Sequence, residues 1–226
     1  LIIEGARQVG KTWLMKEFGK EAYKKCAYVN FEDNDDLRGL FEHDFDIQRI
    51  IANLQWTTGV TIDEDTLIIL DEIQEAPRGI TALKYFQEKA PQYHVIAAGS
   101  LLGIAMHKND SFPVGKVDFM HLYPLSFYEF LNARGEKKMV DLRQAKDWTM
   151  LTMVRAKFGE RLRQYYFVGG MPAAVLAFVN DGDLNKVRTI QKSIIEAYER
   201  DFSKHAPAIE VPRIRRVWHS IPSQLS

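Results

Sequence analysis

A loop bounded by two glycines near the amino end limits the folds open to this chain. Leu1-Ile2-Ile3 reads as a short buried strand, and a helix is expected from about Lys11 to Gly19. The loop between them matches the pattern G-x-x-x-x-G-K-[ST] at every position, with the sequence Gly5-Ala6-Arg7-Gln8-Val9-Gly10-Lys11-Thr12. A strand, this loop and a helix, in that order, indicate a parallel α/β domain.

Each position of the loop suits the binding of a triphosphate. The glycines let the backbone turn tightly and approach a ligand, and successive N–H groups at a helix N-terminus attract anions. We expect Lys11 to reach the β- and γ-phosphates and the Thr12 hydroxyl to coordinate Mg²⁺. Arg7 and Gln8 could instead face the adenine or a partner. The predicted nucleotide-binding residues are Gly5, Ala6, Arg7, Gln8, Val9, Gly10, Lys11, Thr12 and Trp13. The alternative is a plain glycine loop beside an exposed lysine.

A second candidate site follows the apolar strand predicted at Thr66 to Leu70, which ends in Asp71 and Glu72. Ligands of open α/β sheets bind at the carboxyl ends of strands. We therefore expect Asp71 to hold Mg²⁺ through water, and Glu72 to polarise the water that attacks the γ-phosphate. Two surface acids at a strand end are the alternative interpretation.

Two further side chains belong to this candidate site. Ser100 follows the strand predicted at Tyr93 to Ala97 and could touch the γ-phosphate or the attacking water, or could simply form a Gly-Ser turn. Gln74 could also reach that water, although a solvated glutamine is the favoured interpretation.

The order of predicted elements indicates an α/β fold with a parallel sheet, followed by helices. We expect a P-loop core at residues 1–122, a helical lid at 123–205 and the start of a further module at 206–226. A further strand is predicted at Cys26 to Phe31 and helices at Phe45 to Leu54 and Thr81 to Ala90. In the lid, helices are predicted at Phe127 to Ala133, Trp148 to Phe158 and Leu184 to Phe202.

Composition excludes several classes of protein. The 226 residues carry 30 basic and 30 acidic side chains, so the chain as a whole is not a general polyanion binder. With Cys26 as the only cysteine, a disulfide framework is excluded, and a reducing, cytoplasmic setting fits best. No stretch is apolar and long enough to predict a membrane span. Because Leu1 already lies in an apolar run, we expect the chain to be a piece of a longer protein.

Four segments together resemble a known family. The glycine loop and the Leu70-Asp71-Glu72-Ile73-Gln74 strand end look like AAA-type ATPases of the additional-strand group. Two downstream strings, Leu122-Tyr123-Pro124-Leu125-Ser126-Phe127-Tyr128-Glu129-Phe130 and Gly169-Gly170-Met171-Pro172-Ala173-Ala174-Val175, are similar to bacterial and archaeal ATPases that carry a C-terminal domain called DUF4143.

The resemblance covers nearly the whole chain and carries several expectations. It implies a sheet in which the Tyr93 to Ala97 strand lies between the P-loop strand and the Asp71 strand. It implies that Lys11, Thr12, Asp71, Glu72 and Ser100 take the roles given above. It also implies that residues 211–226 begin a winged-helix-like module. Relatives often have Gly-Arg where this chain has Gly115-Lys116, and lysine lacks the planar fork of arginine, which argues against a transition-state role for Lys116.

Two arginine-bearing segments each have two interpretations. Arg78 could reach the nucleotide of a neighbouring subunit or could be a solvated arginine at a helix start. The cluster of Arg213, Arg215, Arg216 and Trp218 could bind nucleic acid if a winged helix follows, or could be a solvated helix face.

The leading functional prediction is a Mg-dependent ATPase that couples hydrolysis to a conformational change. The alternatives are a slowly hydrolysing nucleotide switch or scaffold, a DNA-associated regulator and a small-molecule kinase. A protein partner or self-association is possible, and a membrane partner is not expected. The preference for ATP over GTP rests on the resemblance.

Overall fold

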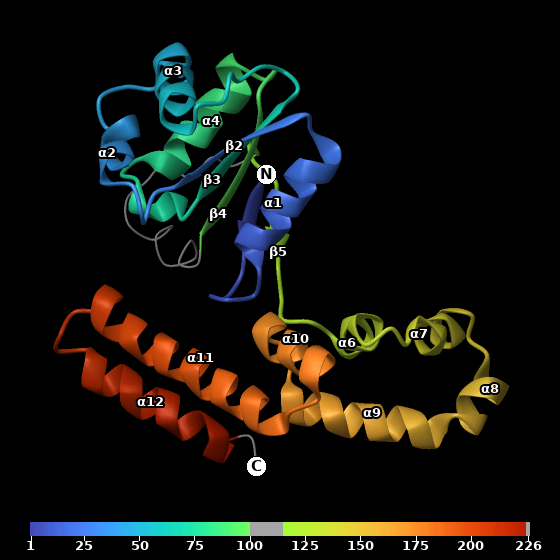
Figure 1. Ribbon diagram of the computed structural model, residues 1–226. Coiled ribbons are helices and arrows are strands. Elements are labelled where there is room, and N and C mark those ends of the chain that lie inside the picture. Colours follow the sequence, from blue (N-terminus) through green and yellow to red (C-terminus); the bar gives the residue numbers. More distant parts are fainter. Residues whose placement is uncertain (100–114, 225–226) are drawn as a thin grey trace. The chain divides into compact units, whose positions relative to one another are not determined.

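The computed structural model describes residues 1–99 and 115–224, apart from the side chains of residues 203–205 in one helix. The chain divides into two compact units, Leu1–Tyr123 and Pro124–Ser226, and each is described by itself (Figure 1). Within the described residues, no helix combines the length and the apolar character that crossing a membrane requires.

The first unit is built on a five-stranded parallel sheet of the P-loop type. Its strand order is β2-β3-β4-β1-β5, so β4 lies between β1 and β3, and the predicted α/β fold and the predicted strand order are both confirmed. The strands are β1 (Ile2–Glu4), β2 (Lys25–Asn30), β3 (Thr66–Asp71), β4 (His94–Gly99) and β5 (Phe119–His121).

Helices cover both faces of this sheet, which explains its apolar strands. Every residue of β3 is buried, and its side chains alternate between two cores. Ile68 and Leu70 face the core under α3 (Ile47–Thr58) and α4 (Gly79–Lys89), whereas Leu67 and Ile69 face α1 (Lys11–Ala22). Figure 1 shows α3 and α4 on one side of the sheet and α1 on the other.

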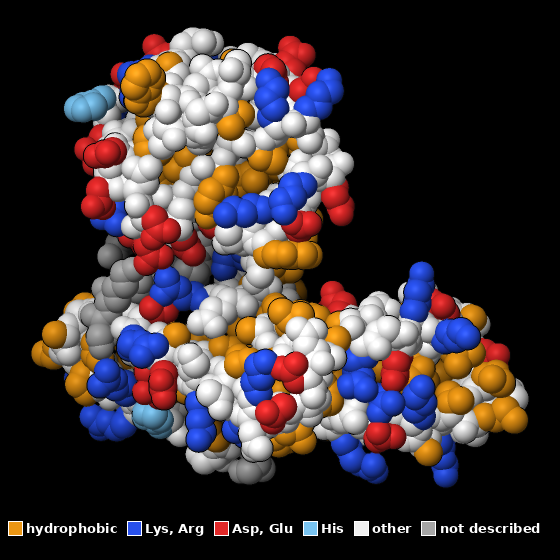
Figure 2. Space-filling view, viewed as in Figure 1, with side chains coloured by type: hydrophobic (Ala, Val, Ile, Leu, Met, Phe, Trp, Pro, Cys, Tyr) orange, Lys and Arg blue, Asp and Glu red, His pale blue; other side chains and the backbone are white. Residues whose placement is uncertain are grey.

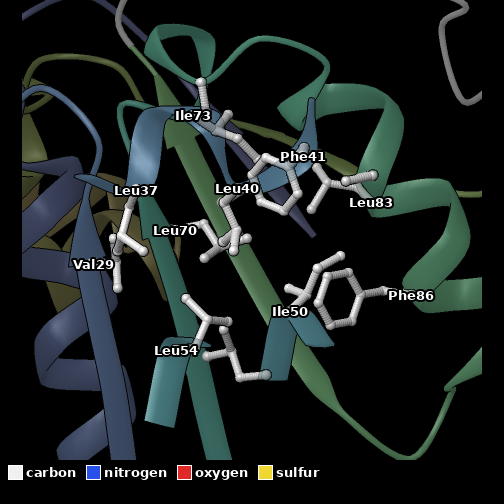
Figure 3. Packing of buried hydrophobic residues seen from close by; sticks show 14 of the residues in the cluster. Val29, Leu37, Leu40, Phe41, Ile50, Leu54, Leu70, Ile73, Leu83 and Phe86 are labelled. Carbon is white, nitrogen blue, oxygen red and sulfur yellow. The ribbon is translucent and has the colours of Figure 1, made fainter. Parts of the chain in front are cut away.

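The larger of the two cores fixes the sheet under α3 and α4 (Figure 3). Ile47, Ile50, Ile51 and Leu54 form one buried face of α3 at spacings of three and four residues. The helix begins two residues later than the predicted Phe45, because the Asp46 carboxylate accepts hydrogen bonds from the N–H groups of Gln48 and Arg49. A short helix, α2 (Asp35–Arg38), forms within the acidic stretch that follows β2.

The register of the strands places the residues at their carboxyl ends side by side. Asp71 lies opposite Asn30 of β2 and Ala98 of β4, and Glu4 of β1 lies opposite Gly99. The loop that follows β1 and the two acids that follow Leu70 therefore emerge at the same edge of the sheet, where open α/β sheets bind ligands.

The second unit consists of helices, and residues 124–224 contain no strand. The helices are α6 (Phe127–Ala133), α7 (Lys137–Gln144), α8 (Trp148–Met153), α9 (Arg155–Val168), α10 (Pro172–Asp181), α11 (Leu184–His205) and α12 (Val211–Gln224). The single helix predicted at Trp148 to Phe158 is divided, because Val154 leaves the helical region of the backbone (φ −99°, ψ 10°). Residues 211–224, predicted to begin a winged-helix-like module, form α12.

Two strings that carry the family resemblance meet inside this unit. The Leu125 N–H donates to the Gly170 carbonyl (2.7 Å), and the Tyr165 hydroxyl donates to the Leu125 carbonyl (2.7 Å). Ser126 and Glu129 form a reciprocal capping box at the start of α6. The string Pro124 to Phe130 is thus a helix start that is fixed against the turn before α10.

The close approach at Gly170 predicts a large loss of stability for Gly170→Ala. A Cβ there would lie 2.2 Å from the Leu125 carbonyl oxygen, so the backbone must shift and the Leu125–Gly170 hydrogen bond is strained. We expect the free energy of unfolding to fall by about 2–3 kcal/mol, measured by chemical denaturation. Gly159→Ala, in the open middle of α9, is the matched control and should stabilise by up to about 1 kcal/mol. Equal effects of the two variants would contradict this account.

Charged side chains of both signs are interspersed over the visible surface of each unit (Figure 2). The basic cluster near the C-terminus is partly engaged within the chain. Trp218 stacks on Tyr198 (ring centroids 5.9 Å apart) and meets Phe202 edge-on (5.4 Å), while Arg213 pairs with Glu210 (3.4 Å). Trp218 therefore packs α12 against α11.

Candidate nucleotide-binding site

The glycine loop joins β1 to α1 and adopts a backbone that most residues avoid. Gly5, Gln8 and Gly10 all have positive φ (154°, 65° and 97°). Gly10 is the N-cap of α1, and no side chain of residues 1–99 or 115–224 caps the helix. The first N–H groups of α1 are therefore left for a ligand, as an anion site at a helix N-terminus requires.

Gly5 is confined by the segment that follows β5. A Cβ at this position would lie 2.3 Å from the carbonyl oxygen of Leu122. Only glycine fits here, and its conformation fixes the entry to the loop. The loop is thus held directly against the residues that lead into the second unit.

Lys11 lies inside the loop that it follows. Its side chain is 6% exposed, and its Nζ donates to the carbonyl oxygens of Gly5 (2.9 Å) and Ala6 (2.8 Å). Burial lowers the pKa of Lys11, and the negative charges of Glu72 and Asp71 oppose that shift. The ammonium group is thus held by carbonyl groups of the loop itself, and its contact with phosphates stays a prediction.

Asp71 is in contact with Thr12, the other predicted metal ligand. It is 2% exposed at the end of β3, and its Oδ2 accepts a hydrogen bond from the Thr12 hydroxyl (2.6 Å). Its Oδ1 accepts from the backbone N–H of Glu72 (3.1 Å). A carboxylate and a hydroxyl in contact are hard oxygen ligands of the kind that Mg²⁺ binds together with substrate phosphates.

Tyr28 of β2 is a member of this group that the sequence analysis missed. Its hydroxyl donates to Asp71 Oδ2 (3.2 Å), and the Lys16 ammonium lies 3.6 Å from the centre of its ring. Burial, followed by the charge of Asp71, raises the pKa of Tyr28, so the hydroxyl keeps its proton and stays a donor. Tyr28 lies two residues before Asn30 on β2, the strand that pairs with the strand of Asp71. This position is the feature of the sequence that could have identified it.

Glu72 follows β3 in a left-handed backbone conformation (φ 49°, ψ 45°), which is uncommon for a residue with a side chain. Its Oε2 accepts a hydrogen bond from Gln74 Nε2 (2.6 Å). Gln74 is half-buried and makes this hydrogen bond, so its side chain is not fully solvated. The two side chains form one polar unit beside Asp71.

The remaining residues of the predicted site lie at its margin. Arg7 pairs with Glu32 (3.5 Å), which belongs to the acidic stretch after β2. Trp13 is 67% exposed on α1. Ser100 lies outside the described residues, so its predicted contact with the γ-phosphate or water stays a prediction.

Arg78 and Lys116, the two cationic residues considered for contact with a nucleotide, have partners in this chain. Arg78 donates to the carbonyl oxygen of Glu42 (2.6 Å), and its guanidinium lies 4.2 Å from the centre of the Phe45 ring. Lys116 pairs with Glu88 (3.6 Å). These contacts favour local structural roles over a transition-state contact.

The donor set fits Mg²⁺ and a triphosphate. Uncapped N–H groups and one buried ammonium suit phosphate oxygens, and the Thr12–Asp71 pair suits one hard cation. Among the described residues, no group of three or more His, Cys, Asp or Glu side chains is arranged to hold a metal ion.

Comparison with known proteins places two families on the chain. The AAA_14 family, described as an AAA domain, matches residues 1–131, and a domain of unknown function, DUF8612, matches residues 159–226. The second match includes all of residues 206–226, where the sequence predicted the start of a DUF4143-like module, and the family found there is DUF8612. A search of curated proteins finds no match.

Three solved structures share low sequence identity with the chain. The Walker-type ATPase PABY2304 of Pyrococcus abyssi is similar over 95% of this chain and 70% of its own, with 16% identity and a TM-score of 0.48. PCH-2 of C. elegans covers 64% of this chain and 39% of its own (14% identity, TM-score 0.35). The Aeropyrum pernix ORC2 protein, in ADPNP–ADP complexes, covers 58% and 43% (19% identity, TM-score 0.34).

The AAA_14 match spans the glycine loop, β3 with its two acids, and the strand β4 between β1 and β3. It also extends over more than half of the chain. The chain therefore belongs to the AAA_14 family of AAA domains.

Proposed function

We propose that this chain binds Mg·ATP in the loop from Gly5 to Thr12 and hydrolyses it to ADP and phosphate. The observation that carries the proposal is the 2.6 Å contact between Thr12 and Asp71, next to a lysine buried in the loop. A cation ligand pair beside a phosphate-binding ammonium is the arrangement that P-loop NTPases use. Closer membership of the DUF4143-carrying group stays part of the proposal.

In the proposed mechanism, each residue acts on one part of the substrate. The N–H groups at the start of α1 and the Lys11 ammonium bind the phosphate oxygens, for which Lys11 gives up its bonds to Gly5 and Ala6. Thr12 and Asp71 hold the Mg²⁺, which would neutralise charge on the phosphates when bound. Glu72 polarises the attacking water and accepts its proton.

The contact between Gly5 and Leu122 supports coupling to the second unit. A ligand that tightens the loop acts on the backbone at Leu122. The second unit begins two residues later, at Pro124. We propose that ATP binding and hydrolysis alter this segment and thereby bias the conformation of the helical unit.

Titration of the 226-residue chain with a fluorescent ATP analogue tests the central claim. We expect saturable binding that requires Mg²⁺ and is competed by ATP, and release of phosphate from ATP under single-turnover conditions. Chelation of Mg²⁺ by EDTA should weaken the binding strongly. Absence of Mg-dependent binding by well-folded protein would rule the proposal out.

Tyr28→Phe is expected to raise the Mg²⁺ concentration needed for half-maximal binding by about 3–10-fold, because Asp71 loses one of the donors that orient it. The phenylalanine ring keeps the contact with Lys16. The measurement is a Mg²⁺ titration at fixed fluorescent nucleotide. Tyr23→Phe is the matched control, since that ring contacts Phe18 and His94 away from Asp71. An unchanged Mg²⁺ requirement would remove Tyr28 from the site.

A further inference from the structure

Gln74 has a polar atom with no partner next to the predicted catalytic carboxylate. Its Nε2 donates to Glu72 Oε2 (2.6 Å), and its Oε1 is buried and accepts no hydrogen bond from the described residues. A buried acceptor without a donor destabilises the folded chain, so most native structures avoid it. Beside reactive residues, such a group is a candidate acceptor for a substrate or a water.

The backbone holds Gln74 and Glu72 in fixed relative positions. Both belong to a tight turn in which the Glu75 N–H donates to the Glu72 carbonyl (2.9 Å) and the Ala76 N–H donates to the Ile73 carbonyl (3.1 Å). Ile73, between them, is fully buried in the core under α4. The left-handed conformation of Glu72 adds local strain, which proteins retain mainly at functional sites.

We propose that Gln74 is a positioning residue for ATP hydrolysis, an inference that rests on the function proposed above. Its amide N–H orients the Glu72 carboxylate. Its Oε1 is buried in the chain without nucleotide, so it becomes accessible when nucleotide binds and then accepts a hydrogen bond from the attacking water. The water oxygen forms a bond to the γ-phosphorus while the bond to the leaving oxygen of ADP breaks. One proton passes to Glu72, and the other stays on the attacking oxygen, directed at Gln74 Oε1.

The chemistry favours this assignment because a water molecule can donate two hydrogen bonds. Glu72 alone would fix one of them and leave the water free to rotate about it, whereas a second acceptor fixes the direction of attack. An amide is suited to this task, since it donates to the carboxylate with one end and accepts from the water with the other. The arrangement stabilises the transition state more than the bound substrate.

Gln74→Met tests the proposal, because methionine keeps the length of the side chain and removes both polar atoms. We expect kcat to fall about tenfold with KM for Mg·ATP within about twofold of wild type. Binding provides a readout independent of turnover. The Kd for Mg·ADP·aluminium fluoride, which mimics the transition state, should rise about tenfold, while the Kd for Mg·AMP-PNP stays within about twofold. Gln87→Met, on the exposed side of α4, is the matched control.

A double variant separates positioning from a general structural effect. In the Glu72→Gln background, Gln74→Met should cause little further loss of kcat, because both side chains act on one water. A wild-type kcat in Gln74→Met, or a parallel loss of AMP-PNP binding, would overturn the proposal. So would a fall of more than about 8 °C in Tm, since it would show a mainly structural role. If wild-type chain fails to bind Mg·AMP-PNP at all, the proposed function itself is wrong, and that result is distinct from a normal Gln74 variant.

Discussion

Replacing Lys11 with alanine is expected to weaken Mg·ATP binding by about 100-fold or more and to abolish measurable hydrolysis. Lys11 is the buried ammonium of the loop, and a bound triphosphate would exchange its two carbonyl partners for phosphate oxygens. Each charge-assisted hydrogen bond contributes about 1.5–3 kcal/mol, so two of them correspond to at least two powers of ten in Kd. Titration with a fluorescent ATP analogue measures the loss directly.

The control for this variant lies on the same helix. Lys20 is exposed in the last turn of α1 and pairs with Glu17, so Lys20→Ala should leave nucleotide binding unchanged. Both variants should stay folded, because the carbonyl groups released by Lys11→Ala can be hydrated through the open loop. If Lys11→Ala bound Mg·ATP as tightly as wild type, the loop would not be the nucleotide site.

Local patterns predicted the parts of the fold that are built from contiguous residues. β3 was predicted because an apolar run is followed directly by two acids. The loop was predicted because the motif fixes the spacing of its glycines, lysine and threonine. α11 was predicted from one apolar face. The main boundary errors have local causes, such as the Asp46 cap and the break at Val154.

Elements with weak local signals were missed. β5 has three residues that are all exposed, so no burial pattern marks it, and it forms by pairing with β1. α10 was read only as a family string, although Pro172 in its first turn is a standard helix start. β5 thus depends on a partner strand that is distant in the sequence.

The candidate site shows the same limit. The sequence indicated Lys11, Thr12, Asp71 and Glu72, because each occupies a position that a known motif defines. Tyr28 lies on another strand, and its contact with Asp71 follows from the strand order. A motif is enough to identify a single functional residue. Predicting which functional residues are in contact requires the order of the strands in the sheet.

Glu72→Gln is expected to slow ATP hydrolysis by about 10²–10³-fold while the Kd for Mg·ATP stays within about threefold of wild type. The amide keeps the shape of the side chain and an oxygen that can still accept from Gln74 Nε2, so the turn after β3 should be preserved. What it loses is the ability to take a proton from the attacking water, and general base catalysis contributes about 10²–10⁴-fold to rates. The rate is measured as single-turnover release of phosphate, which separates chemistry from product release.

The comparison of binding with chemistry in this variant decides between the two leading functions. A hydrolase must show the loss in the chemical step alone, because Glu72 acts on the water and not on the phosphates. Glu75→Gln, three residues further along the same turn, is the matched control and should hydrolyse ATP at the wild-type rate. Equal single-turnover rates for wild type and Glu72→Gln would show that Glu72 is not the base. Very slow wild-type hydrolysis combined with tight binding would instead identify a switch, in which occupancy of the loop by ATP, and the contact of Gly5 with Leu122, carries the signal.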